Sequence, residues 1–230
     1  MQSSTIDCMQ MISMAFIRSI FIVVVSTLTI LTGCARTSPE TDFWKWFQKN
    51  EAALFDFERD QEGVFDRLAV EMHKVHPGLT FEFGPKQDGR REFVISADGI
   101  REAFPKVESL ASAAPALPRW TVIRFRPRRE PADIQYNGMT VKASTVSVSI
   151  HPDGAKVGLT VLIPGYSASE RRTFGSIAFL FLDQALGEFD VETRVGDVDV
   201  RAPLPADSNA VPLSELPRTF DTFVSKQTAL

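Results

Sequence analysis

The stretch "VSVSIHPDGAKVGLTVLI" (146–163) decides the fold class. Two segments rich in Val, Ile and Leu, 146–150 and 157–163, flank a Pro-Asp-Gly sequence that is typical of a turn. Their period-two pattern predicts a pair of strands with a buried face. The apolar residues that follow predict a helix near 168–186, and "DVETRV" (190–195) reads as a further strand.

The same order of elements occurs earlier in the chain. "LTFEF" (79–83) and "EFVIS" (92–96) predict paired strands, the residues from Asp98 to about Ala114 predict a helix interrupted at Pro105, and "WTVIRF" predicts a strand. The sequence therefore predicts an α+β fold, with one mostly antiparallel sheet covered by helices. The repeated order indicates a duplicated strand-strand-helix-strand unit, at roughly 79–126 and 146–195.

Helices are also predicted ahead of the first strand. Apolar residues recur at helical spacing from Phe43 to Phe57, and again from Gln61 to His76. Thr41 or Asp42 is the expected N-cap of the first helix. The predicted organisation is a signal peptide at 1–33, a tether at 34–41, a single α+β domain at 42–205 and a C-terminal tail with a short helix at 206–230.

An uncharged apolar run from Ser19 to Ala35 follows a basic segment ending at Arg18. The run is short for a membrane span, which needs about 20 apolar residues, but it fits an export signal. Met1, Met11 and Met14 are the candidate initiators. Its end, Leu31-Thr-Gly-Cys34, resembles the lipobox of bacterial lipoprotein signal peptides. That resemblance implies lipidation of Cys34, with acyl chains such as palmitate, and cleavage before it.

The expected location follows from the same resemblance. In Gram-negative bacteria an Asp directly after the lipidated Cys retains a lipoprotein in the inner membrane. Here Ala35 and Arg36 follow Cys34, so the outer membrane, with the domain in the periplasm, is expected. The alternative is an uncleaved N-terminal membrane helix. Since Cys8 and Cys34 are the only cysteines, the exported domain is expected to contain no disulfide.

Composition bounds the function. The hydrophobic fraction of 44% and charged fraction of 23% are typical of a folded globular protein. The net charge of −4 gives no electrostatic basis for binding nucleic acid. The sequence offers no Gly-x-Ser-x-Gly, His-Glu-x-x-His or phosphate-loop motif. No cofactor is expected, and His73 and His76 lack further ligands at metal-binding spacing.

Arginines are the first candidate binding residues. In a strand, Arg124, Arg126 and Arg128 would line one face, either as a solvated surface or as an anion-binding strip. Asp183, on an otherwise apolar helix, would need a partner if buried, and an arginine of the sheet is the expected one. Arg124, Arg126 and Asp183 are therefore the candidate ligand-binding residues.

Aromatic residues are the second candidates. Trp44 and Phe55 share a side of the first predicted helix, off its main apolar stripe. They would be either covered by another part of the protein or exposed as a patch that binds an envelope partner.

Beyond the lipobox, several segments resemble an uncharacterised bacterial family with a Phe-Trp-x-Trp-Phe start. The resemblance is carried by "FWKWF", "LTFEFGP", "REFVISADGI", "LPRW", "FRPRR" and "LDQALGE". It spans about 43–192 and implies a common fold unit but no activity. The leading hypothesis is a lipid-anchored, non-enzymatic binding domain. The alternative is an envelope enzyme or small-anion receptor with an arginine-lined site.

Overall fold

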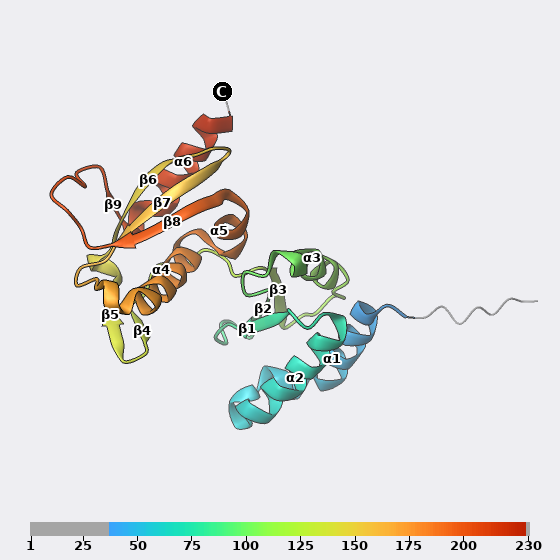
Figure 1. The fold of residues 1–230 in the computed structure, drawn as a ribbon. Coiled ribbons are helices and arrows are strands. Elements are labelled where there is room, and N and C mark those ends of the chain that lie inside the picture. The colour runs from blue at the N-terminus through green and yellow to red at the C-terminus, as the bar shows by residue number, and fades with distance from the viewer. Residues whose placement is uncertain (1–36, 229–230) are drawn as a thin grey trace, which may run out of the picture. The chain divides into compact units, whose positions relative to one another are not determined.

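The structure is a computed structural model that describes residues 37–228 (Figure 1). The predicted signal peptide and Cys34 lie outside these residues. The chain from Thr37 onward forms one compact unit. None of the helices within residues 37–228 has the length and apolar character needed to cross a membrane.

The helices are α1 (Pro39–Phe55), α2 (Gln61–Val75), α3 (Phe104–Ser112), α4 (Arg171–Leu186), α5 (Glu188–Arg194) and α6 (Leu216–Thr228). The strands are β1 (Thr80–Phe83), β2 (Arg91–Ser96), β3 (Trp120–Arg124), β4 (Ile134–Tyr136), β5 (Met139–Val141), β6 (Ser147–Asp153), β7 (Lys156–Leu162), β8 (Val195–Arg201) and β9 (Val211–Pro212). The predicted α+β class is confirmed.

The strand-strand-helix-strand order recurs as a topology. In the sheet β1-β2-β3, β2 is antiparallel to β1 and parallel to β3. In the sheet β8-β7-β6-β9, β7 is antiparallel to β6 and parallel to β8. Each parallel pair is joined by a helical crossover, as parallel neighbours require.

The prediction of one continuous sheet was wrong, because the described residues form three separate sheets, β1-β2-β3, β4-β5 and β8-β7-β6-β9. The first sheet ends where Phe125 donates a last backbone hydrogen bond to Ile95 O, at 2.8 Å. Phe125 then has φ of 61°. This left-handed conformation breaks the two-residue alternation of a strand and turns the chain away.

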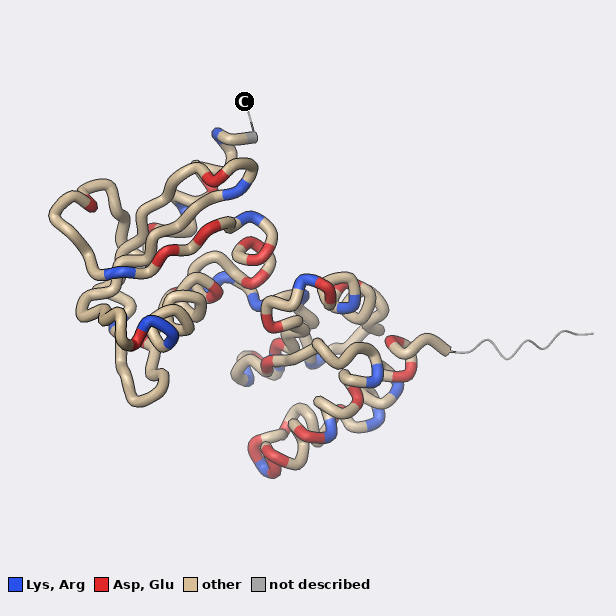
Figure 2. Tube along the Cα trace, viewed as in Figure 1, with Lys and Arg blue, Asp and Glu red and all other residues tan. Residues whose placement is uncertain are grey.

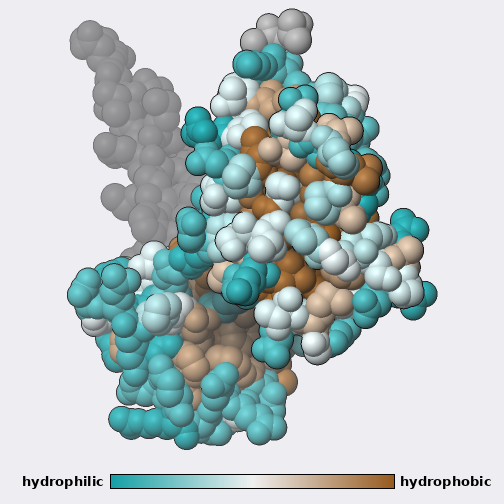
Figure 3. All heavy atoms as spheres, turned by 90° about the vertical axis from the view of Figure 1, so that its left-hand side faces the viewer, coloured by the Kyte–Doolittle hydropathy of each residue, from teal (hydrophilic) through white to brown (hydrophobic). Residues whose placement is uncertain are grey.

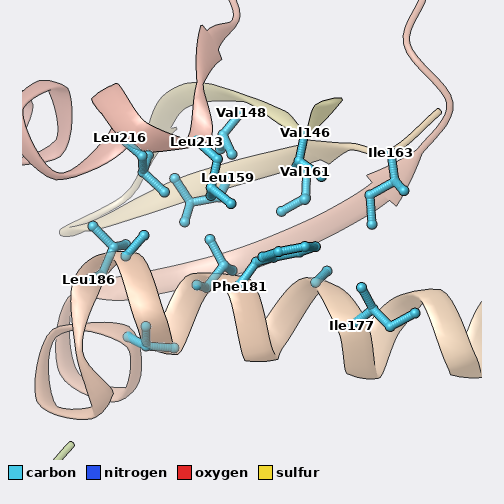
Figure 4. Packing of buried hydrophobic residues seen from close by; sticks show 14 of the residues in the cluster. Val146, Val148, Leu159, Val161, Ile163, Ile177, Phe181, Leu186, Leu213 and Leu216 are labelled. Carbon is cyan, nitrogen blue, oxygen red and sulfur yellow. The ribbon is translucent and has the colours of Figure 1, made fainter. Parts of the chain in front are cut away.

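Each of the two larger sheets has its own apolar core. Phe47, Leu68 and Phe93, all 0% exposed, centre the first, between α1, α2 and the sheet β1-β2-β3. In the second, Ile177 and Phe181 of α4 pack against the apolar face of β6 and β7 (Figure 4). Each buried cluster is the core between one sheet and the helices that cover it.

The first helix begins earlier than predicted. Pro39 occupies its first turn, and the Ser38 hydroxyl accepts a hydrogen bond from the Thr41 N–H at 3.2 Å. Ser38 is therefore the N-cap, in place of Thr41 or Asp42. A proline in the first turn costs nothing, because its missing N–H would have no helical partner there. The segment between Cys34 and the fold is correspondingly shorter.

The predicted strand at 190–195 was also wrong. Gly187 has φ of 77°, ends α4 and lets α5 start at once, so β8 begins only at Val195. A segment of six residues with two apolar side chains, such as 190–195, fits a short helix as well as a strand. In the structure Val191 belongs to α5 and is 4% exposed.

The segment predicted as a tail contributes to the second core. Leu213, Leu216 and Phe220 are at most 1% exposed and belong to the buried cluster of the sheet β8-β7-β6-β9. α6 is thus part of the folded unit.

Charges of both signs are spread along the described chain (Figure 2). The face seen in Figure 3 is largely polar, with apolar side chains visible between the polar ones.

Candidate functional site: the pocket beside Arg126

The arginines after β3 do not form a strip. Arg124, the last residue of β3, pairs with Glu108 of α3 at 2.6 Å and is largely exposed. Beyond the positive φ of Phe125, Arg126 and Arg128 contact different carboxylates. The prediction that these three side chains share one face is therefore wrong.

Arg126 lies among three carboxylates. Its Nε is 2.7 Å from Glu82 Oε1, Nη2 is 2.5 Å from Asp98 Oδ1 and Nη1 is 3.4 Å from Asp183 Oδ2. The predicted pairing of Asp183 with an arginine is present. Burial alone would lower the pKa of Arg126, but the hydrogen bond with Asp98 and the charges of Asp98, Glu82 and Glu188 together outweigh it, so the pKa is raised. This guanidinium stays charged.

Asp183, on α4, is the most perturbed acid of this group. Burial, together with the nearby charges of Glu188 and Glu192, raises its pKa to about 6 against the lowering effect of Arg126. Its side chain is 24% exposed. A carboxyl in this state exchanges a proton near neutral pH, which is the property that a general acid or base needs.

Glu188 fixes the backbone around this group. Its side chain is fully buried, and its carboxylate accepts hydrogen bonds from the backbone N–H groups of Ala97 (2.9 Å), Gly99 (3.2 Å) and Arg126 (3.1 Å). A buried carboxylate is tolerated where such donors replace water. One side chain of α5 thus holds both the turn after β2 and the segment after β3.

Arg128 and Arg129 also hold the segment after β3 in place through contacts of their side chains. Arg128 donates to Asp221 of α6 and Asp190 of α5, and its Nε donates to Leu186 O at 3.0 Å. Arg129 pairs with Glu92 of β2. The bidentate contact of Arg128 with Asp221 is the geometry that gives an Arg–carboxylate pair its strength. These two arginines stabilise the fold.

A pocket of about 340 Å³ opens beside Arg126. It is lined by Glu82, Asp98, Arg126, Pro127, Arg129, Leu180, Asp183 and Gln184. Leu180 is 40% exposed. Charged groups and the apolar side chains of Leu180 and Pro127 therefore meet at one concave site, which is typical of a binding pocket.

The second pair of candidates is buried. Trp44 and Phe55 are 2% and 6% exposed, and Trp44 Nε1 donates to Leu110 O at 2.7 Å. Phe55 packs edge-to-face on Trp120, with ring centroids 5.7 Å apart. A partner cannot reach these rings, so their predicted partner-binding role is wrong. The helix stripe is wider than the sequence indicated because α3 and β3 cover its second side.

His73 is exposed on α2, and His76 is partly buried. His76 follows α2, and its Nδ1 accepts the Gly78 N–H at 3.1 Å. Within residues 37–228 no three His, Cys, Asp or Glu side chains are grouped as a metal site would need.

Sequence reasoning missed Glu82, Asp98 and Glu188. Glu82 was predicted only as a strand residue and Asp98 only as the start of a helix, and Glu188 was given no role. The one available signal was Asp183, whose need for a partner identified the arginine segment but not the other acids.

None of the family models, curated proteins or solved structures compared with the chain matches it. The likeness to a family with a Phe-Trp-x-Trp-Phe start stays a prediction. The α+β fold with its mixed-charge pocket is the basis for the functional proposal.

Proposed function

We propose that this chain is a lipid-anchored protein of the bacterial envelope, attached through Cys34, whose folded domain is a non-enzymatic binding domain. The proposed location is the periplasmic side of the outer membrane. The lipobox-like Leu31–Cys34 segment and the uncharged run before it support the anchor. The pocket beside Arg126 supports the binding role.

The early start of α1 bears on how the domain would be held. Only residues 35–38 separate Cys34 from Pro39. Fully extended, this segment spans at most about 18 Å. A lipid on Cys34 would therefore keep the domain close to the membrane surface, where its partner would be another envelope component.

Within the pocket, the observation that carries the binding role is the pairing of its charges. Arg126 is engaged by Glu82, Asp98 and Asp183, and exposed Leu180 adjoins them. Fixed charges beside an apolar wall recognise a ligand by complementarity. An anion would meet an arginine already surrounded by acids, so the geometry favours the binding domain over the small-anion receptor.

An envelope enzyme is the second candidate, and one observation favours it. The pKa of Asp183 is raised to about 6 at the wall of the pocket. Such a carboxyl would serve as a general acid or base. An envelope hydrolase activity abolished by Asp183→Asn, with the fold retained, would establish this role.

The anchor is tested by labelling cells with radioactive palmitate and fractionating their membranes. We expect label and membrane retention for the unaltered chain and for Cys8→Ser, the control. The label should be lost in Cys34→Ser, because the thiol that would carry the lipid is absent. Membrane retention of the unaltered chain without any label would indicate an uncleaved N-terminal helix and overturn the lipoprotein proposal.

A further inference from the structure

The carboxylates around Arg126 retain hydrogen-bonding capacity. Glu82 uses Oε1, Asp98 uses Oδ1 and Asp183 uses Oδ2 to contact the guanidinium. Within the described residues, the second oxygen of each has no donor from the protein. A carboxylate accepts about four hydrogen bonds, so three acceptor groups with open positions line one pocket.

The charges of the pocket wall are unbalanced. Three carboxylates, those of Glu82, Asp98 and Asp183, face the guanidiniums of Arg126 and Arg129. Arg129 is itself paired with Glu92, so its charge is already matched outside this set. One guanidinium thus offsets three acids, and complementarity favours a cationic occupant.

An apolar surface adjoins these charges. Leu180 of α4 lines the pocket and is 40% exposed. Pro127 forms part of the same wall. An occupant that uses the whole site therefore carries an apolar group next to its positive charge.

We propose that the pocket beside Arg126 binds a Lys or Arg side chain of a polypeptide partner, with an adjacent apolar side chain of that partner on Leu180 and Pro127. This inference rests on the proposed binding function and specifies its ligand. The cation contacts the open oxygens of Glu82 and Asp98, the two most exposed acids of the pocket, with side chains 54% and 61% exposed. Arg126 holds those acids in position.

The test is ligand-observed NMR on the full chain in detergent micelles. The probe is acetyl-leucyl-arginine amide, and the control is acetyl-leucyl-citrulline amide, which has nearly the same shape but no charge. We expect saturable binding of the arginine peptide and at least about tenfold weaker binding of the citrulline peptide, because charge-assisted hydrogen bonds are lost. Equal binding of the two peptides would overturn the proposal.

Two variants locate the binding. Glu82→Gln and Asp98→Asn each should weaken the arginine peptide by at least about fivefold, whereas Glu108→Gln, which removes an exposed acid paired with Arg124, should leave it unchanged. Asn tolerates the positive φ of residue 98, so the turn is kept. Binding that survives both pocket variants would refute this site.

Two further probes separate the alternatives. Acetyl-glycyl-arginine amide should bind more weakly than the leucyl peptide, and equal binding would refute the apolar contact on α4. Preferential binding of acetyl-leucyl-glutamate amide would replace this proposal with an anion site at Arg126. No binding of any peptide would overturn the inference, while the palmitate experiment would decide the anchor independently.

Discussion

The carboxylate of Glu188 accepts a hydrogen bond from the backbone N–H of Ala97 at 2.9 Å, across 91 positions of the chain. The contact joins α5, in the crossover of the second repeat, to the turn that follows β2 of the first. With the further bonds from Gly99 and Arg126, this one side chain satisfies three backbone donors. The turn that carries Asp98 into the pocket is thus held from the other repeat.

Replacing this acid tests how much the contact stabilises the protein. In Glu188→Gln, the amide keeps one acceptor oxygen but sets an NH₂ donor against a backbone N–H. We expect a loss of about 2–4 kcal/mol in the free energy of unfolding, measured by urea denaturation. Glu215→Gln, which loses only an exposed pair with Arg218, should change it by less than about 0.5 kcal/mol. Similar small losses in both would contradict a role for Glu188 in joining the repeats.

Asp183 should make stability depend on pH in an unusual direction. Its pKa is raised from 3.8 to about 6 in the folded protein, so between these values the folded state binds the proton more tightly than the unfolded state. Stability contributed by this group therefore falls as pH rises through that window. Above pH 6 the full cost applies, up to about 3 kcal/mol.

The variant Asp183→Asn removes this titration. Compared with the unaltered protein, it should gain relative stability as pH rises from 4 to 7.5, as measured by urea denaturation at each pH. Glu40 and Asp207, whose pKa values are lowered to about 2, act in the opposite sense but are common to both proteins. A constant difference between the two proteins over this range would refute the raised pKa.

The sequence predicted the elements best where the apolar residues follow a single period, either two residues for a strand or about 3.6 for a helix. The alternation in 146–163 predicted β6 and β7, which pair residue by residue from Ser147 with Leu162 to Asp153 with Lys156. Helical spacing likewise predicted α2 within one residue of its observed end. Such patterns report local burial, and local burial suffices to identify an element.

The geometry of the candidate site depends on contacts between distant parts of the chain. Phe125 adopts a conformation that aromatic residues rarely have, stabilised by packing on Phe104 and Phe189 from elsewhere in the chain. That turn separates Arg126 from Arg124 and sends it toward Asp183. Because the compensation comes from tertiary contacts, neither the break in the strand nor the pairing of Arg126 with Glu82 and Asp98 could be predicted from the segment itself.

Gly187 and Gly165 both have positive φ but differ in how easily they would accept a side chain. Gly187 has φ of 77° and ψ of 149°, and a Cβ there would lie 3.1 Å from Arg126 O, whereas Gly165 has φ of 81° with nothing within 4 Å of such a Cβ. Gly165→Ala should cost about 1 kcal/mol from its positive φ. Gly187→Ala should cost at least about 2 kcal/mol, because its φ and ψ lie in a region that almost only glycine adopts and because the arginine segment must also move. Thermal unfolding of both variants checks this, and equal costs would contradict the larger cost expected at Gly187.

The buried indole of Trp44 allows a matched comparison within one helix. Its Nε1 donates to Leu110 O at 2.7 Å, joining α1 to α3. Trp44→Phe keeps an aromatic ring but leaves this carbonyl without its donor, so we expect a loss of about 1–3 kcal/mol in urea denaturation. Trp46 packs at the edge of the same core, and within the described residues its indole Nε1–H has no protein acceptor. Trp46→Phe should therefore cost about 1 kcal/mol or less. A larger loss for Trp46→Phe than for Trp44→Phe would mean that ring packing, and not the hydrogen bond to α3, dominates the contribution of these residues.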